Sequence, residues 1–355
     1  MIAINGRFLT QGLTGVQRYA GEMVRALDEL ARRGEAPPMR LLVPPGAQGQ
    51  EAFPALSPQT VGSAGGQRWE QLDLPRALNG DYLLNLGNTA PLLAGSRQAV
   101  VIHDAGVFDT PESYGWKFRT WYRGLQRGLV WRGARILSVS QFSAGRISVN
   151  LGVKEERIGV TLEGGEHILR EPADASILAR HGLETRRYAL VVGTGAAHKN
   201  LAALHSAIGA LAERGLVLAV AGAKDAGVFR QEGAPALDAH VRALGRVSDA
   251  ELRALYESAL CLVFPSRYEG FGLPPVEAMW CGCPVVGNRV GAVAEVCGNA
   301  ALWFEPTRPD SLGECVARLA DDAALREMIV DAGRLRTAGF SWDAAARRLL
   351  EFLPR

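Results

Sequence analysis

The most informative stretch of the sequence is CLVFPSRYEGFGLPPVEAM, which spans residues 261–279. Its apolar beginning is typical of a strand, and the run from Leu273, with two prolines near its first turn, predicts a helix. Gly270 and Gly272 lie between the two. Glycines let a backbone approach a phosphate, and the free N–H groups at a helix N-terminus favour negative charge. The stretch therefore predicts a strand, an anion-binding loop and a helix, in that order.

Two glutamates bracket this loop, Glu269 before it and Glu277 within the expected helix. Carboxylates at these positions can accept hydrogen bonds from the hydroxyls of a sugar or a ribose. The arrangement suits a nucleotide sugar, with backbone amides for the pyrophosphate and carboxylates for the two sugar rings. The alternative is a loop with two surface glutamates, one of them placed to suit the helix dipole.

Short apolar runs alternate with helical patterns along the rest of the chain. The expected strands are Ile2–Asn5, Arg40–Val43, Tyr82–Leu86, Ala99–His103, Ile136–Val139, Tyr188–Gly193, Val217–Ala221, Cys261–Phe264, Pro284–Gly287 and Leu302–Phe304. Helical stretches such as Val16–Arg33 and Phe142–Asn150 lie between them. This alternation is typical of parallel sheets covered by helices on both faces, so we expect an α/β protein.

The strand pattern is interrupted near Gly164–Leu183 and then resumes, which predicts two doubly wound domains. At roughly 100–200 residues per domain, a chain of 355 residues also favours two. We expect an N-terminal Rossmann-like domain over 1–170, a C-terminal one over 171–338, and a last helix within 339–355 that packs back on the first domain.

Composition excludes several classes of protein. The net charge of +2 and the lack of a Lys/Arg tract argue against nucleic acid as a partner. Five cysteines in the C-terminal half predict reduced, mostly buried thiols in a cytoplasmic protein. The first residues predict a strand and no signal peptide, and we expect no membrane-spanning helix.

Seven stretches, taken in order, resemble the retaining GT-B glycosyltransferases of family 4. They are LTGVQRY (13–19), VIHD (101–104), ILSVSQFS (136–143), VGT (192–194) with HKN (198–200), LGRVSD (244–249), YEGFGLPPVEAM (268–279) and CGCPVV (281–286). The resemblance covers nearly the whole chain and is greatest for bacterial mannosyltransferases of O-antigen and polysaccharide assembly. It implies a GT-B fold, in which two Rossmann-like domains face each other across a cleft. The first domain would bind the acceptor and the second the nucleotide sugar.

The resemblance also implies roles for individual residues. Lys199 would hold the donor diphosphate and stabilise the charge on the leaving group, Glu269 would hold the donor sugar, and Glu277 the ribose. A lysine beside a helix N-terminus opposes the dipole, and an anionic ligand would explain it. Many family members have arginine where this chain has His198, so the role of that position stays open. Further donor contacts are expected at Gly15, Thr194, Arg246, Val247, Gly270, Phe271, Gly272 and Leu273.

Two residues of the first half complete the expected site. His103 follows an apolar strand, and the resemblance places it against the donor sugar; the alternative is a structural hydrogen-bonding histidine. Arg18, one turn inside the first helix, is expected to help bind the acceptor or a phosphate. The alternative for Arg18 is a solvated helix residue.

The expected reaction is retaining transfer of a hexosyl group, with mannose from GDP-mannose as the first choice. The expected acceptor is a glycan or a polyprenyl-linked oligosaccharide, and UDP- and dTDP-sugars are alternative donors. We find no Asp-x-Asp pair in a strand-end loop, so we expect no metal and no cofactor besides the donor substrate. Alternatives of other classes are a non-catalytic sugar-nucleotide-binding protein, a GT-B epimerase and an NAD-dependent Rossmann oxidoreductase, although the last lacks a full glycine fingerprint.

Residues 113–135 combine six aromatic and six basic side chains with no acid. Such a helix in the acceptor domain is a candidate for peripheral contact with the inner face of the cytoplasmic membrane. The alternative is a helix that buries its aromatic rings in the core and solvates its arginines.

Overall fold

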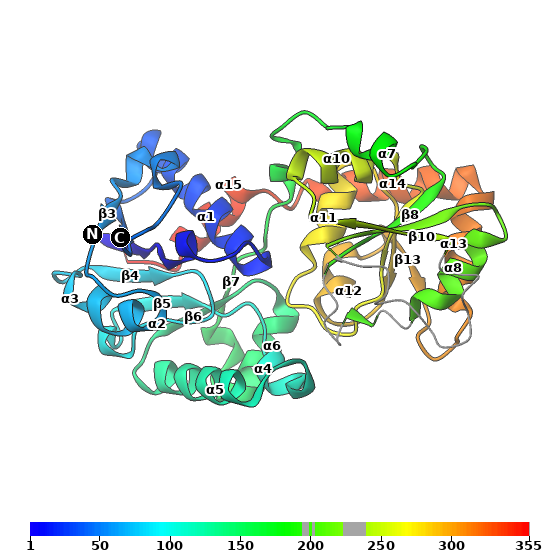
Figure 1. The fold of residues 1–355 in the computed structure, drawn as a ribbon. Coiled ribbons are helices and arrows are strands. Elements are labelled where there is room, and N and C mark those ends of the chain that lie inside the picture. Colours follow the sequence, from blue (N-terminus) through cyan, green and yellow to red (C-terminus); the bar gives the residue numbers. More distant parts are fainter. Residues whose placement is uncertain (194–198, 201–202, 223–238, 355) are drawn as a thin grey trace. The chain divides into compact units, whose positions relative to one another are not determined.

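The computed structural model describes all residues except 194–198, 201–202, 223–238 and 355. The chain divides into two compact units, Met1–Gly164 with Trp342–Arg355, and Gly165–Ser341. Each unit is built on one sheet of parallel strands, of seven and six strands respectively, and this confirms the predicted α/β fold class (Figure 1). The division lies ahead of the expected boundary at 170/171, because the turn η8 (Glu166–Leu169) buries His167 and Ile168 in the second unit.

The sheet of the first unit has the strand order β3-β2-β1-β4-β5-β6-β7. Its strands are β1 (Ile2–Asn5), β2 (Met39–Val43), β3 (Gln59–Thr60), β4 (Tyr82–Asn85), β5 (Gln98–Val101), β6 (Arg135–Ser138) and β7 (Gly159–Val160). Its helices are α1 (Gly15–Arg32), α2 (Gly66–Arg68), α3 (Leu74–Arg76), α4 (Gly106–Asp109), α5 (Trp116–Trp131), α6 (Gln141–Leu151) and α15 (Trp342–Leu350). All four residues of β1 are buried, as expected for a central strand covered on both faces.

Helix α1 forms where the sequence places apolar residues at helical spacing. Tyr19, Met23, Leu27 and Leu30 are fully buried, and α15 packs against this helix within the same unit. The ring of Trp342, at the start of α15, meets Tyr19 edge to face at 5.8 Å between centroids. The last helix therefore belongs to the core of the first unit.

The sheet of the second unit has the strand order β10-β9-β8-β11-β12-β13. Its strands are β8 (Tyr188–Val192), β9 (Val217–Ala221), β10 (Val241–Gly245), β11 (Cys261–Phe264), β12 (Val285–Asn288) and β13 (Ala301–Phe304). Its helices are α7 (Ser176–Arg180), α8 (Leu204–Ala212), α10 (Asp249–Ser258), α11 (Leu273–Trp280), α12 (Gly291–Cys297), α13 (Ser311–Asp321) and α14 (Ala323–Thr337). Helices α8 and α13 pack together in one hydrophobic cluster with the sheet.

In both sheets the order of the strands reverses once. The reversal falls between β1 and β4 in the first unit and between β8 and β11 in the second. Open parallel sheets bind ligands outside the carboxyl ends of their strands at this switch point. The topology therefore predicts ligand-binding loops after β1 and β4 in the first unit, and after β8 and β11 in the second.

The five cysteines are all free, and all but Cys281 are buried. Burial raises the pKa of the Cys261 and Cys297 thiols to about 12, so both stay protonated near neutral pH. The expectation of reduced, mostly buried thiols is confirmed.

Candidate active site

The loop between β11 and α11 lies at the switch point of the second unit. Pro274 occupies the first turn of α11, and Gly272 caps the helix in the left-handed region at φ +106°. Two asparagines, Asn200 and Asn288 at the end of β12, hold the start of this loop. Asn200 Nδ2 donates to Pro265 O and Asn288 Nδ2 donates to Ser266 O, each at 3.2 Å. The start of the loop is therefore held by two side chains. The predicted order of strand, loop and helix over residues 261–279 is confirmed.

Lys199 and Glu269 meet at this switch point. Lys199 follows β8, Glu269 follows β11, and Lys199 Nζ donates to Glu269 Oε1 at 2.7 Å. Their side chains keep 19% and 16% of their surface exposed, so the pair is shielded but reachable from solvent. The ammonium also lies 5.2 Å from the centre of the Phe264 ring. The two residues expected to act on the donor are thus brought into direct contact.

Glu277 has a different environment from Glu269. Its side chain is buried, Oε1 accepts from His167 Nε2 and Oε2 accepts from the Tyr256 hydroxyl, each at 3.0 Å. Burial, followed by the Glu277 charge, holds the pKa of Tyr256 well above its usual value, so the phenol remains a donor. Sequence reasoning missed both His167 and Tyr256, which lie 110 and 21 positions from Glu277.

Two further residues that were expected to contact the donor, Phe271 and Leu273, are buried. The ring of Phe271 packs edge to face against Phe340 at 5.8 Å between centroids. Leu273 is buried at the first position of α11. Thr194 and His198 lie outside the described residues.

The segment after β10 carries Arg246 and Val247. Gly245 ends the strand at φ +69°, and the exposed Arg246 follows it. Ser248 then caps α10: its Oγ accepts from the Glu251 amide, and the Glu251 carboxylate accepts from the Ser248 amide. This capping box fixes the end of the loop that carries Arg246 and Val247.

In the first unit, the loop after β1 leads into α1. Thr14 is the N-cap, Gly15 is the first helical residue, and a Cβ added at Gly12 or Gly15 would meet nothing within 4 Å. The loop is exposed and open to an approaching group. Arg18 lies half-buried one turn into the helix.

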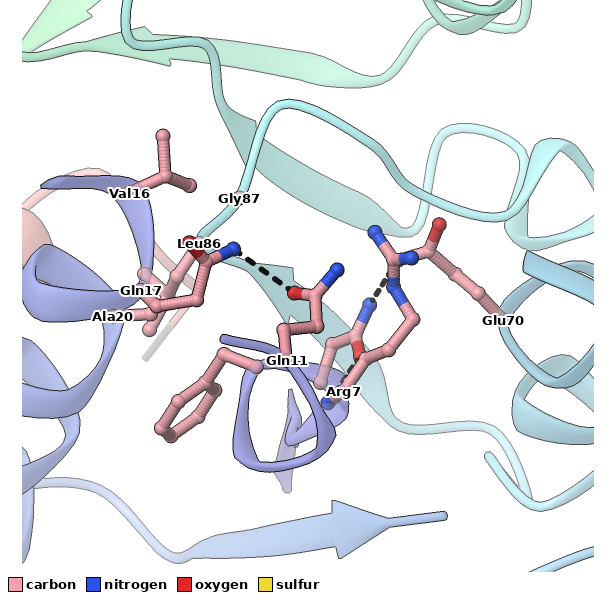
Figure 2. A pocket seen from close by; sticks show the side chains of 10 residues that line it. Arg7, Gln11, Val16, Gln17, Ala20, Glu70, Leu86 and Gly87 are labelled. Carbon is pink, nitrogen blue, oxygen red and sulfur yellow. Dashed lines mark hydrogen bonds and ion pairs between the residues drawn. The ribbon is translucent and has the colours of Figure 1, made fainter. Parts of the chain in front are cut away.

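A small cavity of about 20 Å³, lined by both polar and apolar residues, lies between this loop and the end of β4 (Figure 2). Gln17 Nε2 donates to Gln11 Oε1 at 3.1 Å on one side of it. On the other side Arg7 Nε donates to Glu70 Oε1 at 3.0 Å. The buried Arg7 charge is thereby neutralised within the protein, so it does not make the cavity wall strongly cationic.

His103 lies after β5 and is 5% exposed. Its Nε2 donates to Leu86 O at 2.9 Å, and Nδ1 lies 3.8 Å from the Glu163 carboxylate. Tyr19 meets the imidazole edge to face at 4.6 Å between centroids. Both nitrogens therefore face protein acceptors in this structure, an arrangement that favours the structural alternative considered for this histidine.

A family model described as glycosyl transferases group 1 matches residues 175–336 of the chain. The O-antigen chain mannosyltransferase B of Escherichia coli is 33% identical over 258 residues, which cover 70% of this chain and 67% of that protein. The chain belongs to the group 1 glycosyltransferases. This glycosyltransferase is also 30% identical to the O-antigen chain mannosyltransferase RfbU of Salmonella typhimurium, over 62% of this chain and 59% of the relative.

Solved structures agree with the GT-B fold. WaaG, a glycosyltransferase involved in lipopolysaccharide biosynthesis, has a TM-score of 0.71 at 14% identity, with 99% of each chain covered. HepE of Anabaena, solved in complex with UDP-glucose, has a TM-score of 0.69 at 18% identity over 99% of this chain and 98% of that one. At identities of 14% and 18%, this similarity shows the fold alone.

Among the described residues of this glycosyltransferase, no helix is long and apolar enough to cross a membrane. Within the same residues, no group of three or more His, Cys, Asp or Glu side chains is arranged to hold a metal ion.

Proposed function

We propose that the chain is a retaining hexosyltransferase that takes mannose from GDP-mannose and adds it to a lipid-linked glycan. The observation that carries the proposal is the contact between Lys199 and Glu269 at the switch point of a group 1 glycosyltransferase. The choice of mannose rests on the similarity to two O-antigen mannosyltransferases. UDP-sugars are the next choice, since HepE binds UDP-glucose.

Each member of the pair has a task in this proposal. A diphosphate carries more negative charge than one carboxylate, so it competes with Glu269 for the Lys199 ammonium. Lys199 then stabilises the charge that grows on the departing phosphate. Glu269, released from the lysine, accepts hydrogen bonds from the hydroxyls of the donor sugar.

The positive charge for the leaving group comes from Lys199 and from the N-terminal amides of α11, and we propose that no metal ion is needed. The departing phosphate itself accepts the acceptor proton in this scheme. His103, whose Nε2 is bound to Leu86 O, acts as a structural residue.

A thermal-unfolding screen with GDP, UDP, dTDP and ADP, followed by their sugars, tests the donor. A ligand that binds only the native state raises its stability, by about 2.7 kcal/mol at a hundred times its Kd. We expect GDP and GDP-mannose to give the largest shift, and turnover of GDP-mannose to survive EDTA. If only UDP raises the unfolding temperature, the donor is a UDP-sugar and not GDP-mannose. If no nucleotide raises it, the protein is not a sugar-nucleotide-dependent enzyme. Inactivation by EDTA would refute metal independence.

We further propose that helix α5 rests on the anionic surface of the membrane that carries the acceptor. Trp116, Trp121 and Trp131 are 67%, 44% and 82% exposed, so these rings are not in the core. Lys117 lies over the ring of Trp116 and Arg132 over that of Trp131, at 5.6 and 5.9 Å from the centroids. Exposed tryptophans next to basic residues suit the interface of an anionic bilayer.

A further inference from the structure

The buried carboxylate of Glu277 is held from two sides by residues that have no part in the function proposed above. His167 comes from η8, the first turn of the second unit, and Tyr256 from α10. The side chain of His167 is fully buried and that of Glu277 keeps 7% of its surface exposed. Three elements that are distant in sequence therefore converge on one carboxylate.

The two donors fix the orientation of the carboxylate, because each binds a different oxygen. His167 holds Oε1 and the Tyr256 phenol holds Oε2, both at 3.0 Å. A carboxylate with only one donor can still rotate about its last side-chain bond, whereas two donors on opposite oxygens prevent this. A buried carboxylate also needs such donors to offset the loss of water.

The turn that carries His167 is itself fixed to α11, the helix of Glu277. A Cβ added at Gly165 would lie 2.6 Å from Val276 Cγ1 and 2.7 Å from Trp280 Cδ1, so the backbone approaches α11 as closely as only glycine allows. His167 thus reaches Glu277 from a rigid support. The contact is built into the packing of η8 on α11 and does not depend on an exposed loop.

We propose that His167 and Tyr256 are positioning residues that set the Glu277 carboxylate for the ribose hydroxyls of the nucleotide. This inference rests on the proposed function, in which Glu277 is the ribose ligand. A carboxylate offers about four acceptor sites, so an oxygen that accepts from a protein donor can also accept from a ribose hydroxyl. A carboxylate that is already oriented loses less conformational freedom when the ligand binds, which strengthens the contact.

The test compares the affinity of the full-length protein for GDP and for 2′,3′-dideoxy-GDP, with the uridine pair measured in parallel. Calorimetry gives the Kd of the dideoxy nucleotide divided by the Kd of the ordinary nucleotide. This ratio measures how strongly the protein recognises the ribose hydroxyls. We expect a ratio of about 10 to 100 in the unmodified protein, since hydrogen bonds to a charged group are at stake. Tyr256→Phe and His167→Leu are expected to reduce the ratio to a few-fold, and His167→Gln, which keeps a donor near Nε2, to restore part of it.

The possible outcomes distinguish a failure of this inference from a failure of the proposed function. If Glu277→Gln abolishes the ratio while Tyr256→Phe and His167→Leu keep it, the positioning role is wrong and the ribose role of Glu277 stands. If the unmodified protein binds both nucleotides equally, the ribose role fails and the inference fails with it. A purely structural role lowers the unfolding temperature of Tyr256→Phe and leaves the ratio unchanged, which also overturns the inference. Tyr256→Phe removes a single hydroxyl and is expected to fold even if His167→Leu does not.

Discussion

Lys199 and Glu269 neutralise each other at 2.7 Å, in a place where the proposed reaction needs both charges. We expect Lys199→Gln and Glu269→Gln each to lower kcat/KM by about 10²–10³-fold, as the loss of one electrostatic contact to a transition state does. Steady-state turnover of GDP-mannose measures the effect, and circular dichroism checks that the fold is intact.

Arg308→Gln is the matched control for these two variants. Arg308 forms an ion pair with Glu314 at 2.8 Å in the same unit, but both side chains are more than half exposed. An exposed pair contributes little to stability, so this variant should keep normal turnover. Near-normal turnover of both Lys199→Gln and Glu269→Gln would remove the proposed roles.

At the residue scale, the sequence indicated Lys199, Glu269 and Glu277 as candidates, because each lies in a short stretch with a recognisable pattern. It did not predict that Lys199 binds Glu269, which is 70 positions away, since that contact depends on β8 lying beside β11. Nor did it predict His167, which has no local signal. A buried histidine is found only when the packing of η8 on α11 is known.

Helix α5 exposes three tryptophan rings, those of Trp116, Trp121 and Trp131. At 3.6 residues per turn, Trp116, Lys117, Trp121, Arg127 and Trp131 lie within about 140° of its circumference. The opposite face carries Leu125 and Leu129, which are buried against the core. The sequence suggested both an aromatic core helix and a membrane-facing helix. The exposure of the three tryptophans favours the second.

We expect the protein to sediment with vesicles that contain phosphatidylglycerol, and to be released as salt is raised. Replacing Lys117, Arg127 and Arg132 together by Gln should weaken vesicle binding roughly a hundredfold, at about 1 kcal/mol for each basic residue near an anionic surface. Arg119 and Arg123 are poorer targets, because they donate to the backbone oxygens of Pro111 and Val107.

The control for the vesicle experiment uses exposed apolar residues elsewhere. Met328 and Leu335 on α14 are 59% and 81% exposed, and their replacement by Ala should leave vesicle binding unchanged. Equal loss in the control and in the α5 variant would show non-specific adsorption. Undiminished binding of the α5 variant would exclude the helix as the membrane contact.

Most strands could be predicted within two residues at each end, because buried parallel strands give continuous apolar runs. The exceptions have a physical reason. Strands β3 (Gln59–Thr60) and β7 (Gly159–Val160) have two residues each, too few to show any periodicity. They extend the first sheet at its two edges, where pairing with a neighbouring strand decides their conformation. Strand β10 (Val241–Gly245) is also not among the expected strands. It lies at the edge of the second sheet and has half-buried residues between the buried Val241 and Leu244, so it shows no continuous apolar run.

At the scale of the whole molecule, the chain returns to its first unit at Trp342 after completing the second. Trp342 is 4% exposed and packs on Tyr19, so Trp342→Ala removes a large part of the contact between α15 and α1. Loss of a buried tryptophan costs about 3–5 kcal/mol. Because each unit has its own core, we expect only the first unit to lose stability.

Amide hydrogen exchange followed by mass spectrometry can locate the effect, since local opening reports the stability of each region. In Trp342→Ala, exchange should accelerate in β1, α1 and α15 of the first unit, while β8 and β11 of the second keep their protection. Trp131→Ala, which alters a ring that is 82% exposed, should leave both patterns unchanged. If the strands of the second unit lost protection to the same degree, the two units would unfold as one cooperative body, and a ligand bound to the second would then stabilise the first as well.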